Sequence, residues 1–60
     1  MKLKDAMKLH TGDEVMIKST GEFEYVVEVE KISPKESPNG VGFVNVMIDN
    51  GEWYNHKEIA

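Results

Sequence analysis

Sixty residues are enough for one domain, and a domain this small buries too little surface to be very stable without extra support. The chain has no cysteine, which excludes disulfides and thiolate metal sites. Eleven acidic residues against seven lysines give a formal net charge of -4, and arginine, the usual reader of phosphate and guanine, is absent. The composition therefore argues against nucleic-acid binding, while 40% hydrophobic residues are enough to drive folding.

The charge is unevenly distributed along the chain. Residues 1–10 carry three lysines and one aspartate, a sum of +2, whereas residues 11–60 carry four lysines and ten acids, a sum of -6. No apolar run approaches the roughly 18 residues of a membrane span, and the N-terminal segment lacks the apolar region of a signal peptide. We therefore expect a cytoplasmic protein with no membrane partner.

The first element expected is a short helix over residues 2–10. Leu3, Ala6 and Met7 fall on one face of it at helical spacing. A helix of this length is unstable alone in water and must pack on the rest of the chain. Gly12 can adopt the left-handed conformation that ends a helix.

Two strands are expected next. Residues 14–19 alternate, with Val15 and Ile17 pointing one way and Met16 the other. Residues 22–32 form the longest strand, and their period-two pattern predicts one buried face and one wet face. The buried face is predicted to hold Phe23, Tyr25, Val27 and Val29, and the wet face Glu22, Glu24, Val26, Glu28 and Glu30.

The second half of the chain reads as a loop, a strand and a hairpin. Both prolines lie in the expected loop, residues 33–40, and residues 41–48 form the third strand. The dipeptide Asn50-Gly51 predicts a type I′ hairpin turn, which needs positive φ at both positions. The aromatics at 53–54 lie on a short fourth strand, and residues 56–59 form a helical turn or a last strand that closes the sheet. The core side of the third strand is predicted to hold Val44, Val46 and Ile48.

Four or five strongly bent strands in about 50 residues fit a small barrel, which leaves no sheet edge open. The Gly-Asp-x-Val sequence within Thr11–Val15, the long second strand and the Gly-containing hairpin before a short aromatic strand resemble the SH3-like barrels. The chain is similar to very short SH3-like proteins of unknown function from bacteria and their phages. That resemblance covers about residues 11–59.

The resemblance implies a mainly β fold and transfers no function. We expect a small SH3-like barrel of four to five antiparallel strands with a short N-terminal helix. Residues 1–60 would form one SH3-like domain, with the helix at 1–10 and the barrel at 11–59. The N-terminal helix is an addition to the common SH3 pattern. A phage or prophage origin is also implied.

Catalytic chemistry is not expected. The serines and threonines belong to no recognisable nucleophile motif, and His10 and His56 read as two surface histidines. The glutamates of residues 22–32 lie along a flat strand face, which cannot wrap a cation as a loop does. They read as a solvated face, and the alternative is an acidic patch that binds a basic partner. We therefore expect no enzyme activity, no catalytic or metal-binding residue and no cofactor.

Six residues are candidates for partner binding. Met16, Val26, Phe43 and Met47 are apolar and point away from the predicted core. The N-terminal helix could cover this second face; if it packs elsewhere, the face is exposed and marks a partner site. Trp53 and Tyr54 are the other candidates, because one of two adjacent strand residues must point outward and both types favour binding sites.

The sequence thus predicts a non-enzymatic protein-interaction module whose partner is another protein. Two alternatives stay open. One is a small barrel associated with nucleic acid, since such barrels bind strands through stacked aromatics. The other is a homodimer in which the apolar patch pairs with itself.

Overall fold

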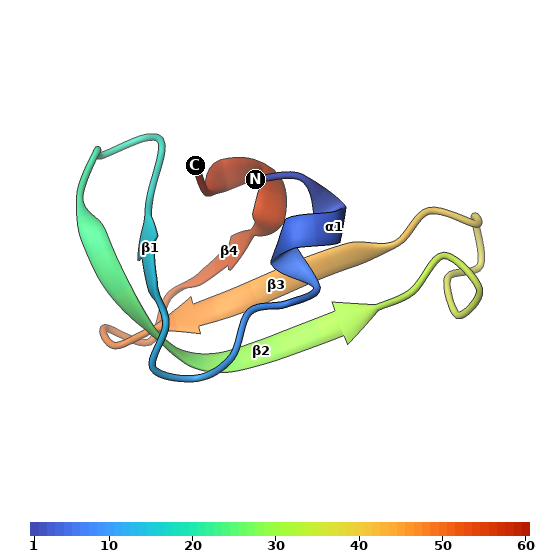
Figure 1. The fold of residues 1–60 in the computed structure, drawn as a ribbon, viewed down its shortest axis with the longest axis horizontal. Coiled ribbons are helices and arrows are strands. Elements are labelled where there is room, and N and C mark those ends of the chain that lie inside the picture. The colour runs from blue at the N-terminus through green and yellow to red at the C-terminus, as the bar shows by residue number, and fades with distance from the viewer.

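The computed structural model describes residues 1–60. Four antiparallel strands form one sheet in the order β1-β2-β3-β4, with a single-turn helix before them (Figure 1). A mainly β fold with four antiparallel strands and a short N-terminal helix is therefore confirmed. The structure contains no helix with the length and apolar character that a membrane crossing requires. The elements are α1 (Leu3–Ala6), β1 (Glu14–Met16), β2 (Phe23–Ile32), β3 (Phe43–Ile48), β4 (Trp53–Asn55) and the 3-10 turn η1 (His56–Glu58).

The sheet is bent but not closed by a continuous ladder. The last residues return to β1 through a single bridge between Ile17 and Ile59. Two backbone hydrogen bonds flank it: Lys18 donates to the carbonyl of Glu58 (2.9 Å) and Ala60 donates to that of Met16 (3.0 Å). Residues 56–59 therefore combine both predicted forms, a helical turn followed by a bridge. A fully closed SH3-like barrel stays a prediction.

A bulge in β2 decides which side chains face the core. Val26 lies opposite Ile48, but Glu28 lies opposite Met47, so Val27 is an extra residue on β2. The alternation of side chains reverses at such a bulge. Even-numbered residues therefore face inward before it and odd-numbered residues after it, which puts both Val26 and Val29 on the core side.

The predicted faces of β2 are therefore wrong before the bulge. Phe23, Tyr25 and Val27 are 64%, 56% and 43% exposed instead of buried. Val26, placed on the wet face by strict alternation, is 1% exposed and lies in the core. The prediction for Val29 holds, since it packs against the core from beyond the bulge.

The core lies on one side of the sheet. The predicted core residues Val44, Val46 and Ile48 of β3 are buried, and so are Val15 of β1 and Ile17 directly after it. Alternation predicts their side correctly because neither strand contains a bulge. Ile59 joins them from the C-terminal segment, and Ala6 and Leu9 from the N-terminal segment. The core residues are Ala6, Leu9, Val15, Ile17, Val26, Val44, Val46, Ile48 and Ile59.

The helix is shorter than expected and packs on the core side. It covers only Leu3–Ala6 of the predicted 2–10, and Lys2 at its N-terminus makes no side-chain capping bond. Burial of Ala6 holds it in front of β3 (Figure 1). The opposite side of the sheet is therefore not covered by the helix.

The β3–β4 hairpin forms as predicted, but with a different turn. Gly51 has a φ of +88°, whereas no residue other than glycine has a positive φ, so Asn50 does not fit a type I′ turn. Gly51 donates to the carbonyl of Ile48 (2.9 Å), and the Ile48 N–H donates to the carbonyl of Glu52 (3.0 Å). These bonds define a three-residue loop with a glycine bulge, which needs only one left-handed residue.

The C-terminal turn is fixed by capping bonds. Asn55 Oδ1 accepts from the Lys57 N–H (3.0 Å), and Glu58 Oε2 accepts from the Asn55 N–H (2.9 Å). This reciprocal pair is a capping box. The N-terminal ammonium group donates to the carbonyls of His56 and Ile59, so the two termini lie side by side (Figure 1).

Candidate functional site

The side of the sheet that faces away from the core is the candidate site, and it is called the outer face below. Neighbouring strand residues point to opposite sides, and directly paired residues share a side. The burial of the core residues therefore identifies the outward ones. They are Glu14, Met16, Phe23, Tyr25, Glu28, Glu30, Ile32, Phe43, Asn45, Met47, Trp53 and Asn55.

Apolar side chains of the outer face are paired across the strands. Met16 lies opposite Phe23, and Met47 lies opposite Trp53. Tyr25 lies between these pairs along the face, next to Phe23 on β2. Trp53 is 48% exposed, and the two β2 aromatics are more exposed still. These five residues, Met16, Phe23, Tyr25, Met47 and Trp53, form what we call the aromatic patch.

A row of polar side chains bounds the aromatic patch on one side. Asn45 Nδ2 donates to Glu30 Oε1, and Asn55 Nδ2 donates to Asn45 Oδ1, both at 3.1 Å. This polar row crosses β2, β3 and β4. Phe43 and its partner Ile32 lie beyond it, so Phe43 is separated from the aromatic patch.

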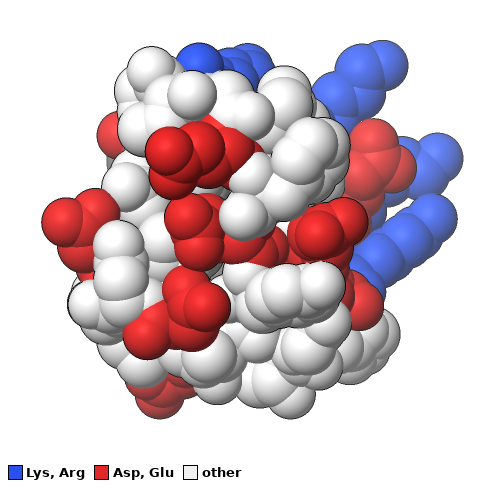
Figure 2. All heavy atoms as spheres, turned by 90° about the vertical axis from the view of Figure 1, so that its left-hand side faces the viewer, with Lys and Arg blue, Asp and Glu red and all other residues white.

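The charged residues of the outer face are all acidic. Glu14, Glu28 and Glu30 point outward from the strands, and no lysine does. Figure 2 shows the end of the molecule that carries both hairpins, where acidic side chains are spread among uncharged ones. Lysines appear only at the top and right-hand edges of that view. The aromatic patch is therefore bordered by negative charge.

An acidic cluster, defined as Glu22, Glu24, Asp49, Glu52 and Glu58, is formed by carboxylates that lie near Glu24 or near Tyr54. Partial loss of solvent, a hydrogen bond with Asp49 and the neighbouring carboxylates raise the pKa of Glu24. Like-charge repulsion of this kind favours the neutral acid. No three acidic or histidine side chains of the structure converge as they would to hold a metal ion.

Tyr54 belongs to this cluster instead of the outer face. It lies opposite Val46 on the core side and is partly buried. Its hydroxyl donates to Glu52 Oε2 (2.8 Å), and this bond, with loss of solvent and the nearby carboxylates, raises the pKa of Tyr54. The expectation that one of the two adjacent aromatics points outward is met by Trp53.

The structure places four of the six candidate residues on the outer face. Met16, Met47 and Trp53 lie in the aromatic patch, and Phe43 lies beyond the polar row. Val26 is in the core and offers nothing to a partner.

Sequence reasoning missed Phe23 and Tyr25, the two most exposed members of the patch, because the bulge was not recognised. One signal was available: Val26 is an apolar residue that interrupts the run of glutamates at positions 22, 24, 28 and 30.

The histidines occupy different environments. His10 is exposed, as expected of a surface residue. His56 is 5% exposed, so its expected place on the surface is wrong. Its Nδ1 accepts from the Val44 N–H (3.2 Å) and thereby replaces a backbone acceptor beside β3. This bond gives His56 a structural role.

Comparison with models of protein families, with curated proteins and with solved structures finds no match.

Proposed function

We propose that this protein is a non-enzymatic interaction module whose aromatic patch binds another protein. The observation that carries the proposal is the exposure of Phe23, Tyr25 and Trp53, which all point away from the core of a small sheet. Contiguous apolar surface bordered by charge usually marks a partner site. Tryptophan and tyrosine are also the residue types that most often dominate binding energy.

Charge supports a basic partner. The three outward glutamates share the outer face with the aromatic patch, and no strand lysine points outward there. A segment that presents aliphatic or aromatic side chains flanked by lysine or arginine matches both properties. Electrostatic complementarity of this kind speeds association and selects the partner.

The same charges weigh against the two alternatives. Phosphate groups would be repelled by the acids around the aromatics, although the aromatics themselves could stack on bases. A second copy docked symmetrically on this face would bring two surfaces together that both carry outward glutamates and no outward strand lysine. We therefore place both below a basic protein partner.

We also propose that the chain is a member of the SH3-like barrels. The strand order β1-β2-β3-β4, followed by a 3-10 turn and a bridge back to β1, supports this assignment. The fold adds nothing to the choice of partner, because function is carried by the site.

Selection from a yeast-displayed library of random peptides tests the proposed function. We expect the wild-type protein to enrich peptides that combine Lys or Arg with apolar side chains. Replacing a central aromatic anchor typically costs about 2 kcal/mol, or roughly a 30-fold loss of affinity. Trp53→Ser and Phe23→Ser should each lower the affinity for an enriched peptide by about this factor, as measured by calorimetry. Added salt should lower the affinity of the wild-type protein.

Val41→Ser is the matched control, because Val41 is 58% exposed but lies outside the strands. It should bind like the wild type, and circular dichroism should show that all three variants fold. Peptides that bind Trp53→Ser and Phe23→Ser as tightly as the wild type would refute the proposed face. A wild-type dimer in sedimentation that Trp53→Ser dissociates would assign the face to self-association instead.

A further inference from the structure

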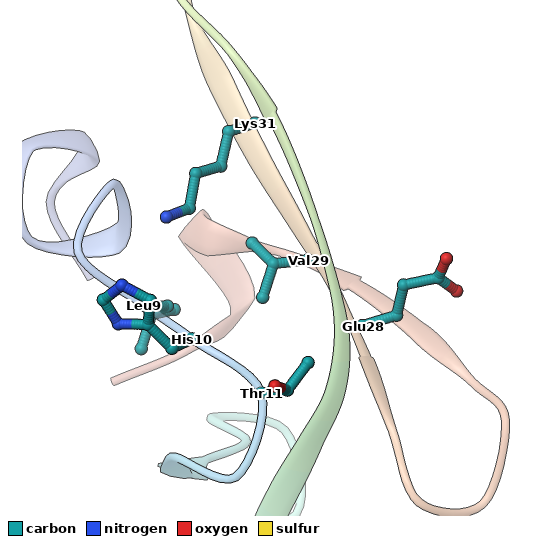
Figure 3. Close-up of a pocket in the computed structure, with 6 residues that line it drawn as sticks. All are labelled: Leu9, His10, Thr11, Glu28, Val29 and Lys31. Atoms are coloured by element: carbon teal, nitrogen blue, oxygen red, sulfur yellow. The ribbon is translucent and has the colours of Figure 1, made fainter.

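A cleft lies on the other side of β2 from the aromatic patch. It has a volume of about 470 Å³ and opens between residues 9–11 of the N-terminal segment and the second half of β2 (Figure 3). Its lining residues are Leu9, His10, Thr11, Glu28, Val29 and Lys31. Ligand sites have volumes of about 300–1,000 Å³, so the space suits a small molecule or one residue of a peptide.

The wall made by the N-terminal segment is held in place before any ligand arrives. Gly12 donates to the carbonyl of Val26 (2.7 Å), and Val26 donates to that of Asp13 (2.9 Å). The Asp13 carboxylate accepts from the His10 N–H (2.8 Å), and Leu9 is buried in the core. A wall that is already ordered adds little entropic cost to binding.

The polar groups that line the cleft are mainly hydrogen-bond donors. Lys31 extends from β2 towards the N-terminal segment, with the imidazole of His10 on the opposite side of the gap (Figure 3). Thr11 lies at the same opening. The Glu28 carboxylate points away from the cleft, as its pairing with Met47 on the outer face requires (Figure 3). In a chain of net charge -4, this opening therefore presents cationic and donor groups.

The rest of the lining is apolar. Val29 and Leu9 face the opening from the two walls, and both pack against the core. Val29 and Lys31 share one side of β2 because they are two residues apart, and the bulge at Val27 turns that side towards the core. A ligand placed here meets a positive charge at one end and aliphatic surface at the other.

We propose that the cleft binds a small carboxylate that carries a short apolar chain. The carboxylate accepts hydrogen bonds from Lys31, with His10 and Thr11 beside it, and the chain packs on Leu9 and Val29. Charge-assisted hydrogen bonds to a carboxylate are stronger than neutral ones. Two sources supply this chemistry: the C-terminal residue of a peptide, and a free short-chain fatty acid.

Amide chemical shifts of the isotope-labelled full chain test the proposal. The probes are N-acetylleucine for a peptide C-terminus, hexanoate for a fatty acid, and the neutral amide of each. We expect the carboxylates to shift the signals of residues 9–11 and 28–31 saturably, and the amides to bind at least about tenfold more weakly. Acetate, which lacks the apolar chain, should also bind more weakly. The tighter of the two carboxylates identifies the source.

Variants locate the site. Lys31→Gln should weaken binding about tenfold or more, whereas Lys35→Gln, an exposed lysine of the loop after β2, should not change it. Trp53→Ser should leave carboxylate binding in the cleft intact. The test of the cleft is therefore independent of the test of partner binding at the aromatic patch. Equal binding of acids and amides, an unchanged Lys31→Gln affinity, or no saturable shift at millimolar probe would each overturn the proposal.

Discussion

Glu24 shows how a single side chain is affected by its place in the fold. It lies on the core side of β2, opposite Val15, at the point where the sheet opens towards Asp49. The alternating pattern puts Glu24 on the side opposite Phe23 and Tyr25, but it predicts that side to be wet, whereas in the structure it is the core side. One of the carboxylates that raise its pKa, Asp49, belongs to the other hairpin, and no local pattern predicts that neighbour.

Glu24→Gln should stabilise the protein at neutral pH. The pKa of Glu24 is raised in the folded state, so the folded chain holds this proton more tightly than the unfolded chain does. Its contribution to stability is therefore present at acid pH and is lost as the pH rises through the folded-state pKa. The glutamine variant avoids that loss. We expect a higher melting temperature than the wild type at pH 7, and no difference once Glu24 is protonated.

Glu28→Gln, on the same strand but on the outer face, serves as the comparison for Glu24→Gln. Its effect on the melting temperature should be the smaller of the two at pH 7. A lower melting temperature for Glu24→Gln than for the wild type at neutral pH would contradict the repulsion assigned to the acidic cluster. Carbon-detected NMR titration of the Glu24 carboxyl checks the raised pKa directly.

At the scale of the element, β2 marks the limit of what the sequence predicts. The strand's existence and length follow from its period-two pattern, and the faces of β1 and β3 follow from theirs. The bulge does not, because it is a mismatch between two strands. In the register of β2 with β3, Val26 pairs with Ile48 while Glu28 pairs with Met47. The alternation of residues along β2 alone does not predict this register.

The turn between β3 and β4 was misassigned for a related reason. The dipeptide Asn50-Gly51 fits two kinds of hairpin loop, which differ in whether Asn50 also has a positive φ. In the structure the Asn50 side chain accepts from the Glu52 N–H (2.9 Å) while its backbone stays in the ordinary region. Only Gly51 bears the left-handed conformation.

Gly51→Val should destabilise this hairpin through the backbone alone. A Cβ at position 51 would meet no atom within 4 Å, so steric clash with neighbours contributes nothing. A β-branched residue held at φ of +88° is strained, with an expected cost of about 1–3 kcal/mol. Urea denaturation should show a lower midpoint for Gly51→Val. Gly51→Asn should lose less, because asparagine tolerates the left-handed region better. Equal midpoints for the wild type and Gly51→Val would contradict the turn geometry.

At the scale of the whole molecule, a single core on one side of the sheet stabilises the fold. The aromatic patch lies on the outer face of the sheet, and the cleft lies on the core side. The candidate site could be predicted in part: Met16, Met47 and Trp53 follow from strand alternation. The remaining aromatics of the patch depend on the bulge, and the cleft depends on how the N-terminal segment packs against β2. Neither is a local property of the chain.

Ile59→Ala should unfold most of the molecules. Ile59 is fully buried and links the C-terminal segment to β1 through its bridge with Ile17. Truncating a buried isoleucine to alanine costs about 2–5 kcal/mol, which matches the whole stability of about 3–5 kcal/mol expected of a domain this small. The amide spectrum should lose its dispersion at 25 °C. Ala60→Gly, at the exposed neighbouring position, should leave it intact. A well-dispersed spectrum for Ile59→Ala would show that the closing segment is dispensable.

The same closing segment has a consequence for self-assembly into fibrils. Exposed aromatic side chains on a sheet favour cross-β stacking when the edge strands have unpaired backbone N–H and C=O groups. Here the backbone of residues 58–60 occupies the border of β1. At the other border, β4 is only three residues long, and the Glu58 carboxylate takes up the Asn55 N–H. The molecule can therefore expose aromatic side chains while leaving few unpaired backbone groups at its sheet edges to start amyloid growth.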